Sequence, residues 1–187
     1  MALEIDFSNL QFMLVDSDVH MRTTITDVLR KFGVRGVAEV DDGEAALNIL
    51  DQVNPDIILT EYELPKLDGL DLVKKIRRES QEVHRVKPII ILSAHTQQDQ
   101  VLAARDAGAT EYLAKPVDST TIYKRICSVV VKPRPFIELE SFAGPDRRRR
   151  HDPYLVGQAR RQDDGGELEG DLEGEINEDE IEAMLGL

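Results

Sequence analysis

The 187-residue chain lacks several features that would define its chemistry. It has one cysteine, Cys127, so an internal disulfide and a cysteine metal cluster are both excluded. Its longest strongly apolar runs are four or five residues, whereas a membrane-spanning helix needs about 20. The first eight residues contain two acids and no base, which is unlike a signal peptide. These absences predict a cytoplasmic protein of a reducing compartment.

Positive charge is also scarce, and it is unevenly spread. The formal net charge is −13 and the pI about 4.7, which argues against binding to nucleic-acid polymers or anionic membranes. Residues 1–132 hold 16 bases and 21 acids, 133–161 hold seven bases and four acids, and 162–187 hold 11 acids and no base. The composition predicts a domain over 1–132, a Pro/Arg-rich basic linker over 133–161, an acidic linker over 162–175 and a terminal segment over 176–187.

The body alternates between two kinds of pattern. Apolar runs typical of buried strands alternate five times with helical spacing of apolar residues. Strands are expected at 10–15, 34–40, 56–60, 88–92 and 110–113, and helices at 19–32, 44–53, 70–78, 97–107 and 118–130. The predicted fold class is α/β: a (βα)5 doubly wound, five-stranded parallel sheet covered on both faces. In such a sheet the working crevice lies at the carboxyl ends of the strands.

The residues after those strands carry a family resemblance. The segments that carry it are 14–18 (LVDSD) with Arg22, 55–61 (PDIILTE), 64–69 (LPKLDG), 91–94 (ILSA) and 108–116 (GATEYLAKP). In this order they resemble the response-regulator receiver domain of two-component signalling, and in particular its chemotaxis members. The resemblance covers about 10–132 and implies a flavodoxin-like fold and a phosphoacceptor site.

The resemblance implies an acceptor aspartate, two further acids that hold Mg²⁺, and a hydroxyl and a lysine that hold phosphoryl oxygens. On this reading Asp16 is a metal ligand, Ser93 and Lys115 hold oxygens, and Tyr112 is the aromatic switch. Two positions depart from the family pattern: the acceptor position is Glu61, and the second metal acid is Ser17.

Both departures affect the same reaction. The additional methylene of Glu61 moves its carboxylate by about 1.5 Å, enough to spoil an in-line transfer. The serine weakens Mg²⁺ binding, and Asp18 is at best a partial replacement. The sequence therefore predicts a pseudo-receiver that is not an enzyme, needs no cofactor and binds Mg²⁺ weakly or not at all. Whether Glu61 pairs with Lys115 to mimic phosphorylation, or forms an inert structural ion pair, is left open.

The basic segment offers a second candidate site. Its arginines are paired or clustered near aromatic residues, and guanidinium groups bind phosphates and stack on bases. Receiver-like flagellar adaptors that bind cyclic di-GMP through an arginine-rich C-terminal segment are similar in kind. The candidate ligands are Arg147, Arg148, Arg149, Arg150, Arg160 and Arg161. A protein contact and a mere linker are the alternatives.

The terminal segment predicts a partner-binding helix. Residues 162–175 have the composition of a disordered chain. Beyond them, Asn177 is a plausible N-cap, and Ile181, Met184 and Leu185 fall on one helical stripe. The segment resembles the N-terminal peptide of the flagellar switch protein, which docks on the chemotaxis receiver. We expect docking near Tyr112 and Lys115, in cis or on another receiver; an acidic tail that only aids solubility is the alternative.

The leading functional hypothesis is a phosphorylation-independent signalling adaptor of a two-component or chemotaxis-type pathway, with proteins as partners. One alternative is a cyclic di-GMP-responsive effector. The other is a phosphotransfer regulator with a weakened Mg²⁺ site. Three of the four histidines, at 20, 84 and 95, show no metal-ligand spacing and are expected at the surface or in loops.

Overall fold

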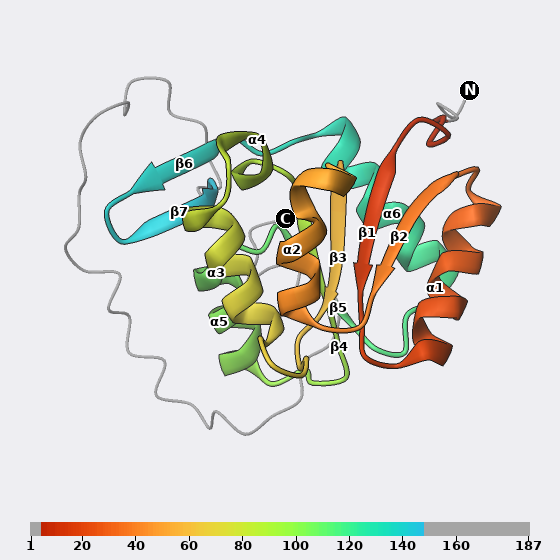
Figure 1. Cartoon of the computed structure of the whole chain (residues 1–187), viewed down its shortest axis with the longest axis horizontal. Coiled ribbons are helices and arrows are strands. Elements are labelled where there is room, and N and C mark those ends of the chain that lie inside the picture. The colour runs from red at the N-terminus through yellow and green to blue at the C-terminus, as the bar shows by residue number, and fades with distance from the viewer. Residues whose placement is uncertain (1–4, 148–187) are drawn as a thin grey trace.

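The computed structural model describes residues 5–147 of the chain. Five parallel strands form one sheet in the order β2-β1-β3-β4-β5. In Figure 1, β1, β2 and β3 are at the front of this sheet. The strands are β1 (Gln11–Val15), β2 (Gly36–Val40), β3 (Ile57–Glu61), β4 (Ile89–Ser93) and β5 (Glu111–Ala114). The predicted doubly wound parallel sheet is therefore confirmed.

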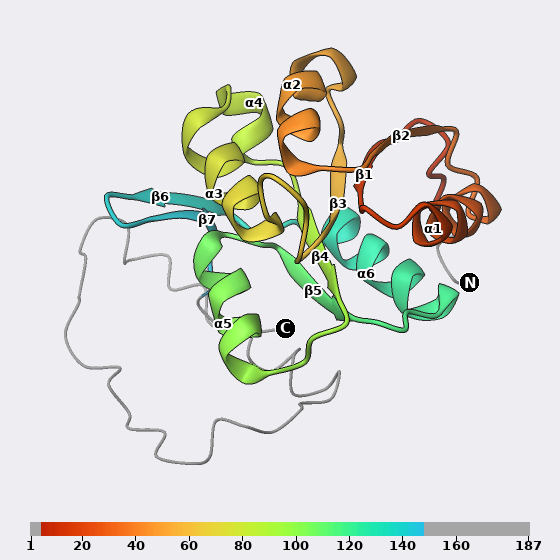
Figure 2. The same cartoon turned by 60° about the horizontal axis from the view of Figure 1, so that its bottom comes forward.

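Helices cover both faces of the sheet (Figure 2). Alternate strand residues divide between two apolar clusters, because successive side chains of a strand point to opposite faces. Met13 of β1 belongs to the cluster beneath α2 (Gly43–Val53), α3 (Gly69–Glu79) and α5 (Gln98–Ala107). Leu14 belongs to the cluster beneath α1 (Val19–Lys31) and α6 (Ser119–Val131), and Cys127 packs against the same cluster.

Aspartates determine where four of the helices begin. The carboxylates of Asp18, Asp42, Asp68 and Asp118 accept hydrogen bonds from backbone N–H groups in the first turns of α1, α2, α3 and α6. Such caps satisfy donors that have no partner within the helix. Helix α5 ends at Gly108, whose φ of 101° lies in the left-handed region that favours glycine.

The chain does not leave the body at residue 132, where the sequence suggested that a linker begins. Strands β6 (Phe136–Leu139) and β7 (Phe142–Pro145) form an antiparallel hairpin, and β7 packs against α3 and α5. The packing is close, because a Cβ at Gly144 would lie 2.9 Å from Gly108 Cα. Proline and glycine in this stretch suggested a linker, yet here glycine serves close backbone approach.

A buried arginine joins the hairpin to the body. Arg77 of α3 is 1% exposed and donates hydrogen bonds to the carbonyl oxygens of Arg85 (2.7 Å), Lys87 (2.7 Å) and Gly108 (2.9 Å). Its guanidinium lies 5.7 Å from the ring centroid of Phe136 in β6. Burial lowers the pKa of Arg77 to about 9, so the group remains charged at neutral pH.

A short helix, α4 (Glu82–Arg85), was not expected from the sequence. It buries His84, which is 2% exposed, and His84 Nε2 lies 2.8 Å from Asp51 Oδ1 in α2. The expected surface position is therefore wrong for His84. None of the helices in residues 5–147 is long and apolar enough to cross a membrane. The predictions for the acidic linker 162–175 and for 176–187 fall outside the described residues.

Candidate functional site

The predicted site residues meet at the carboxyl ends of three adjacent strands. Asp16 follows β1, Glu61 ends β3 and Ser93 ends β4, and these strands are neighbours in the sheet. Lys115 directly follows β5, and its backbone N–H donates to the Ser93 carbonyl oxygen (2.6 Å). Residues up to 99 positions apart in sequence are thereby brought together, as the parallel topology predicts.

Lys115 lies between the two carboxylates of the site. Its Nζ donates to Asp16 Oδ2 at 2.8 Å and also to Glu61 Oε2. The three side chains are 11%, 2% and 13% exposed, so water screens these ion pairs poorly. Burial alone lowers the pKa of Lys115, but the hydrogen bonds to Asp16 and Glu61 outweigh it and leave that pKa raised.

Glu61 is held from both sides. One carboxylate oxygen binds Lys115, and the other accepts a hydrogen bond from the Tyr62 backbone N–H (2.7 Å). The loop after Glu61 folds back so that the Gly69 N–H donates to the Tyr62 carbonyl oxygen (2.9 Å). A Cβ at Gly69 would collide with the carbonyl oxygen of Glu61. The last position of the segment 64–69 therefore requires glycine.

The first acid of the site, Asp16, is held through both its backbone and its side chain. Arg22 Nη1 donates to the Asp16 carbonyl oxygen (2.5 Å), and the Asp18 N–H donates to Asp16 Oδ1 (2.8 Å). The Asp18 carboxylate caps α1 by accepting from the His20 N–H (2.8 Å). This bond lowers the pKa of Asp18, despite a smaller opposing effect of burial. Ser17 is exposed and neutral.

This donor set does not fit a receiver-type magnesium site. Mg²⁺ in proteins is usually held by carboxylates, together with waters, in octahedral geometry. Here both inward carboxylates, those of Asp16 and Glu61, are paired with Lys115, and the remaining metal position is Ser17. Over residues 5–147 no group of three or more His, Cys, Asp or Glu side chains is placed to hold a metal ion.

The predicted switch residue Tyr112 points inward. Its ring is fully buried, and its hydroxyl donates to the His95 carbonyl oxygen at 2.7 Å. Burial raises the pKa of Tyr112 to about 12. Ser93 is also fully buried, and its Oγ accepts from the His95 N–H (3.1 Å). The loop between β4 and α5 is therefore connected to both residues through the backbone of His95.

Two residues of this network were not predicted as site residues. His95 Nε2 lies 3.0 Å from Glu63 Oε1, which joins the β4–α5 loop to the β3–α3 loop above the site. The sequence contains a signal for this pair. Glu63 stands two positions after Glu61, the last residue of β3, and His95 stands two positions after Ser93, the last residue of the neighbouring strand β4. Equal offsets from neighbouring parallel strands bring side chains together.

Among the candidate arginines, the structure describes only Arg147. Its guanidinium stacks on the Phe142 ring, 3.8 Å from the centroid, and its Nη1 lies 2.6 Å from Asp106 Oδ1 of α5. It also donates to the Arg105 carbonyl oxygen. Burial lowers the pKa of Arg147. The other candidate arginines, at 148–150, 160 and 161, and the tail residues Ile181, Met184 and Leu185 lie outside the described residues.

The fold and these strand ends define a receiver. The family model of the response regulator receiver domain matches residues 12–127, and the chain belongs to this family. Among curated proteins it is similar to the chemotaxis protein CheY-3 of Vibrio cholerae, with 30% identity over 118 residues. It is also similar to the chemotaxis protein CheY of Pseudomonas aeruginosa, with 31% identity over 117 residues. These alignments cover 63% of this chain and 89% and 93% of the relatives, respectively.

Solved structures agree with this assignment. The receiver domain of a sensor histidine kinase from Pseudomonas aeruginosa PAO1, with a magnesium ion in its active-site cleft, aligns at 32% identity and a TM-score of 0.60. The chemotaxis protein CheY4 of Vibrio cholerae aligns at 25% identity and a TM-score of 0.60. The two alignments cover 66% and 64% of this chain, and 98% of each of the others.

Proposed function

We propose that this receiver is a phosphorylation-independent signalling adaptor of a chemotaxis-type pathway. It acts through protein contacts and carries out no catalysis. The carrying observation is the position of Lys115 Nζ, which contacts Asp16 and Glu61 together at the place where the family's phosphoryl chemistry would occur. A lysine engaged by two buried carboxylates is not available to receive phosphoryl oxygens unless that pairing is broken.

The state of Glu61 supports the same proposal. An acceptor needs a free carboxylate oxygen in line with the phosphodonor. Both oxygens of Glu61 are engaged, one by the Tyr62 N–H and the other by Lys115. The replaced metal acid, Ser17, removes a ligand for the ion that would neutralise the incoming phosphoryl group. The acceptor position and the metal position are both altered, so neither residue can compensate for the change in the other.

The proposal is tested by weighing the intact protein after incubation with a small-molecule phosphodonor and Mg²⁺. The matched comparison is the double variant Ser17→Asp/Glu61→Asp, which restores both acids. We expect no adduct on the wild type and one phosphoryl group on the double variant. A stoichiometric adduct on the wild type would refute the proposal. An inert double variant would show that these two positions do not explain the block.

Glu61 has two possible roles within this proposal. As a fixed negative charge it holds Lys115 and, through the β4–α5 loop, keeps Tyr112 inward. As an inert ion pair it stabilises the fold without affecting that loop. The variant Glu61→Gln separates the roles, since glutamine retains the shape and removes the charge. Amide shifts at residues 93–97 and 112 support the first role, and shifts confined to 61, 62 and 115 support the second.

A further inference from the structure

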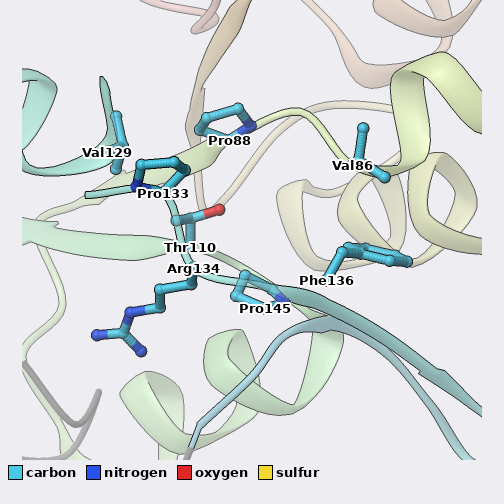
Figure 3. Close-up of a pocket in the computed structure, with 8 residues that line it drawn as sticks. All are labelled: Val86, Pro88, Thr110, Val129, Pro133, Arg134, Phe136 and Pro145. Carbon is cyan, nitrogen blue, oxygen red and sulfur yellow. The ribbon is translucent and has the colours of Figure 1, made fainter. Parts of the chain in front are cut away.

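A small cavity lies at the amino ends of β4 and β5, at the other end of these strands from Lys115. It sits between the hairpin β6–β7 and the segments that lead into β4 and β5 (Figure 3). Its volume is about 70 Å³. Six of the eight residues that line it are apolar: Val86, Pro88, Val129, Pro133, Phe136 and Pro145. Thr110 and Arg134 complete the lining.

The volume decides which kind of ligand could enter. Pockets for small molecules and cofactors measure roughly 300–1,000 Å³. A cavity of about 70 Å³ is too small for a nucleotide but accommodates the end of one aliphatic side chain. The apolar lining favours a hydrophobic side chain, whose removal from water stabilises binding. The cavity therefore fits an anchor residue of a peptide.

The lining of the cavity includes an exposed apolar side chain, Val86, which is 51% exposed. The other large hydrophobic residues exposed in the described chain are Val19, Val83, Val130, Val131 and Leu139. None lies in 94–125, the segment around Tyr112 and Lys115 where the sequence suggested docking. An apolar stripe would bury little there.

The basic rim of the cavity consists of Arg134, which lines it, and the exposed Lys132, which precedes the lining residue Pro133. Two acids, Glu111 and Asp146, also adjoin lining residues, and Glu111 is 1% exposed. At Arg134 and Lys132 an acidic side chain is favoured over a basic one, because opposite charges promote encounter and orient the partner.

We propose that the cavity and its rim are a docking site, in cis, for residues 176–187 of the same chain. The apolar stripe predicted for this segment, Ile181, Met184 and Leu185, stands within a stretch of 11 acids and no base. The segment thus combines the two properties that the site selects: an aliphatic anchor and negative charge. The anchor enters the cavity, and the acids face the basic rim.

The connection to the body makes this contact intramolecular. The hairpin supplies Pro145 to the cavity wall, and the structure describes the chain to Arg147, two residues further on. Residues 148–180 separate Arg147 from the stripe. For a random-coil chain of this length the root-mean-square end-to-end distance is about 30 Å, which corresponds to an effective concentration in the millimolar range. Even a weak anchor is occupied at such a concentration.

Docking at this site has a consequence for partners. While the stripe occupies the cavity it is hidden from any second protein, so the contact is self-inhibitory. It also lies away from Lys115, so docking does not depend on the charge state of the receiver site. The inference is therefore independent of the proposed function, and either can fail alone.

The test uses the full chain with a nitroxide spin label at Asp179→Cys in a Cys127→Ala background. Position 179 lies outside the apolar stripe, so the anchor residues are retained. We expect at least a twofold loss of amide signal intensity at 86, 87, 110 and 129–132, and no loss at 94–97 and 113–115, the carboxyl ends of β4 and β5. Broadening at 94–97 and 113–115 as strong as at the cavity, or none at the cavity, would overturn the proposal. Broadening seen only when labelled chains are mixed with unlabelled isotope-enriched chains would also do so, because it shows docking in trans.

Two matched pairs of variants complete the test. Val86→Glu should abolish the broadening, whereas Val19→Glu should leave it unchanged, since the two valines are 51% and 55% exposed and only Val86 lines the cavity. Likewise Leu185→Glu should abolish it and Leu172→Glu, in the same acidic stretch, should not. Equal effects of Val86→Glu and Val19→Glu would remove the cavity from the account.

Discussion

The variant Lys115→Met tests how firmly the buried charges of the site are coupled. Methionine retains most of the length and apolar volume of lysine and removes the charge together with the N–H donors to Asp16 and Glu61. The change leaves Asp16 and Glu61, which are 2% and 13% exposed, as two neighbouring carboxylates without their shared cation. Each retains one backbone donor, from Asp18 and Tyr62 respectively.

The expected loss follows from the burial of the charges. Removal of one partner from a buried ion pair costs about 3–5 kcal/mol, whereas an exposed pair contributes about 0–1 kcal/mol. Because both carboxylates retain a backbone donor, we expect the lower end, about 3 kcal/mol in the free energy of unfolding at neutral pH. Glu61→Gln should cost less, about 1–2 kcal/mol, since Asp16 still binds Lys115.

Urea unfolding of the wild type, both single variants and the double variant provides the measurement. The double-mutant cycle should give a coupling energy between Glu61 and Lys115 of at least about 1 kcal/mol. The control is Lys74→Met, which breaks an exposed pair with Asp71 and should cost less than about 1 kcal/mol. If Lys115→Met lowers the free energy of unfolding by no more than Lys74→Met does, the claim that Lys115 is a firmly held internal cation is refuted.

Three further predictions concern the hairpin, the switch tyrosine and the arginine segment. Gly144→Ala should lower the free energy of unfolding by about 1–3 kcal/mol, because its Cβ would meet Phe142 at 2.7 Å and Gly108 at 2.9 Å. Gly36→Ala, which meets only the flexible end of Gln11, is the control in the same unfolding assay. The pKa of Tyr112 is raised to about 12, so the folded state retains this proton more tightly than the unfolded state. Its contribution is complete below about pH 10 and is lost as the pH rises towards 12; urea unfolding should show the wild type losing stability relative to Tyr112→Phe in this window. Arg147→Ala should reduce stability by about 1 kcal/mol and leave any heat of cyclic di-GMP titration unchanged, because Arg147 is engaged by Asp106 and Phe142. Loss of that heat in the calorimeter would instead make Arg147 a ligand residue.

The sequence predicted most of the sheet and of the site because both depend on local patterns. Continuous apolar runs placed all five strands within two residues of their observed starts. The runs of the first, third and fourth strands ended one residue before Asp16, Glu61 and Ser93, which lie in the site. The parallel topology then determined that Asp16, Glu61 and Ser93 lie side by side. The departures at Ser17 and Glu61 were visible in the sequence itself.

What the sequence did not predict depends on tertiary contacts. The hairpin 136–145 looked like a linker because Pro133, Pro135 and Gly144 are typical of linkers. Only the folded structure shows that Gly144 is needed for the close approach of β7 to Gly108. Nothing in the sequence distinguishes Arg77 from the other bases of α3, yet it donates hydrogen bonds to carbonyl oxygens of two separate segments, at residues 85 and 87 and at residue 108. His84 is buried by a short helix that has no strong sequence pattern.

The central claim is that the site of this receiver does not respond to phosphoryl chemistry. Its most direct test is the amide spectrum of the full chain before and after addition of Mg²⁺ and beryllofluoride, which mimics a phosphoryl group on an acceptor carboxylate. The account predicts unchanged shifts at Ser93, His95 and Tyr112 in the wild type. It also predicts shifts at these residues in Ser17→Asp/Glu61→Asp. Shifts of the same size in the wild type would contradict the account.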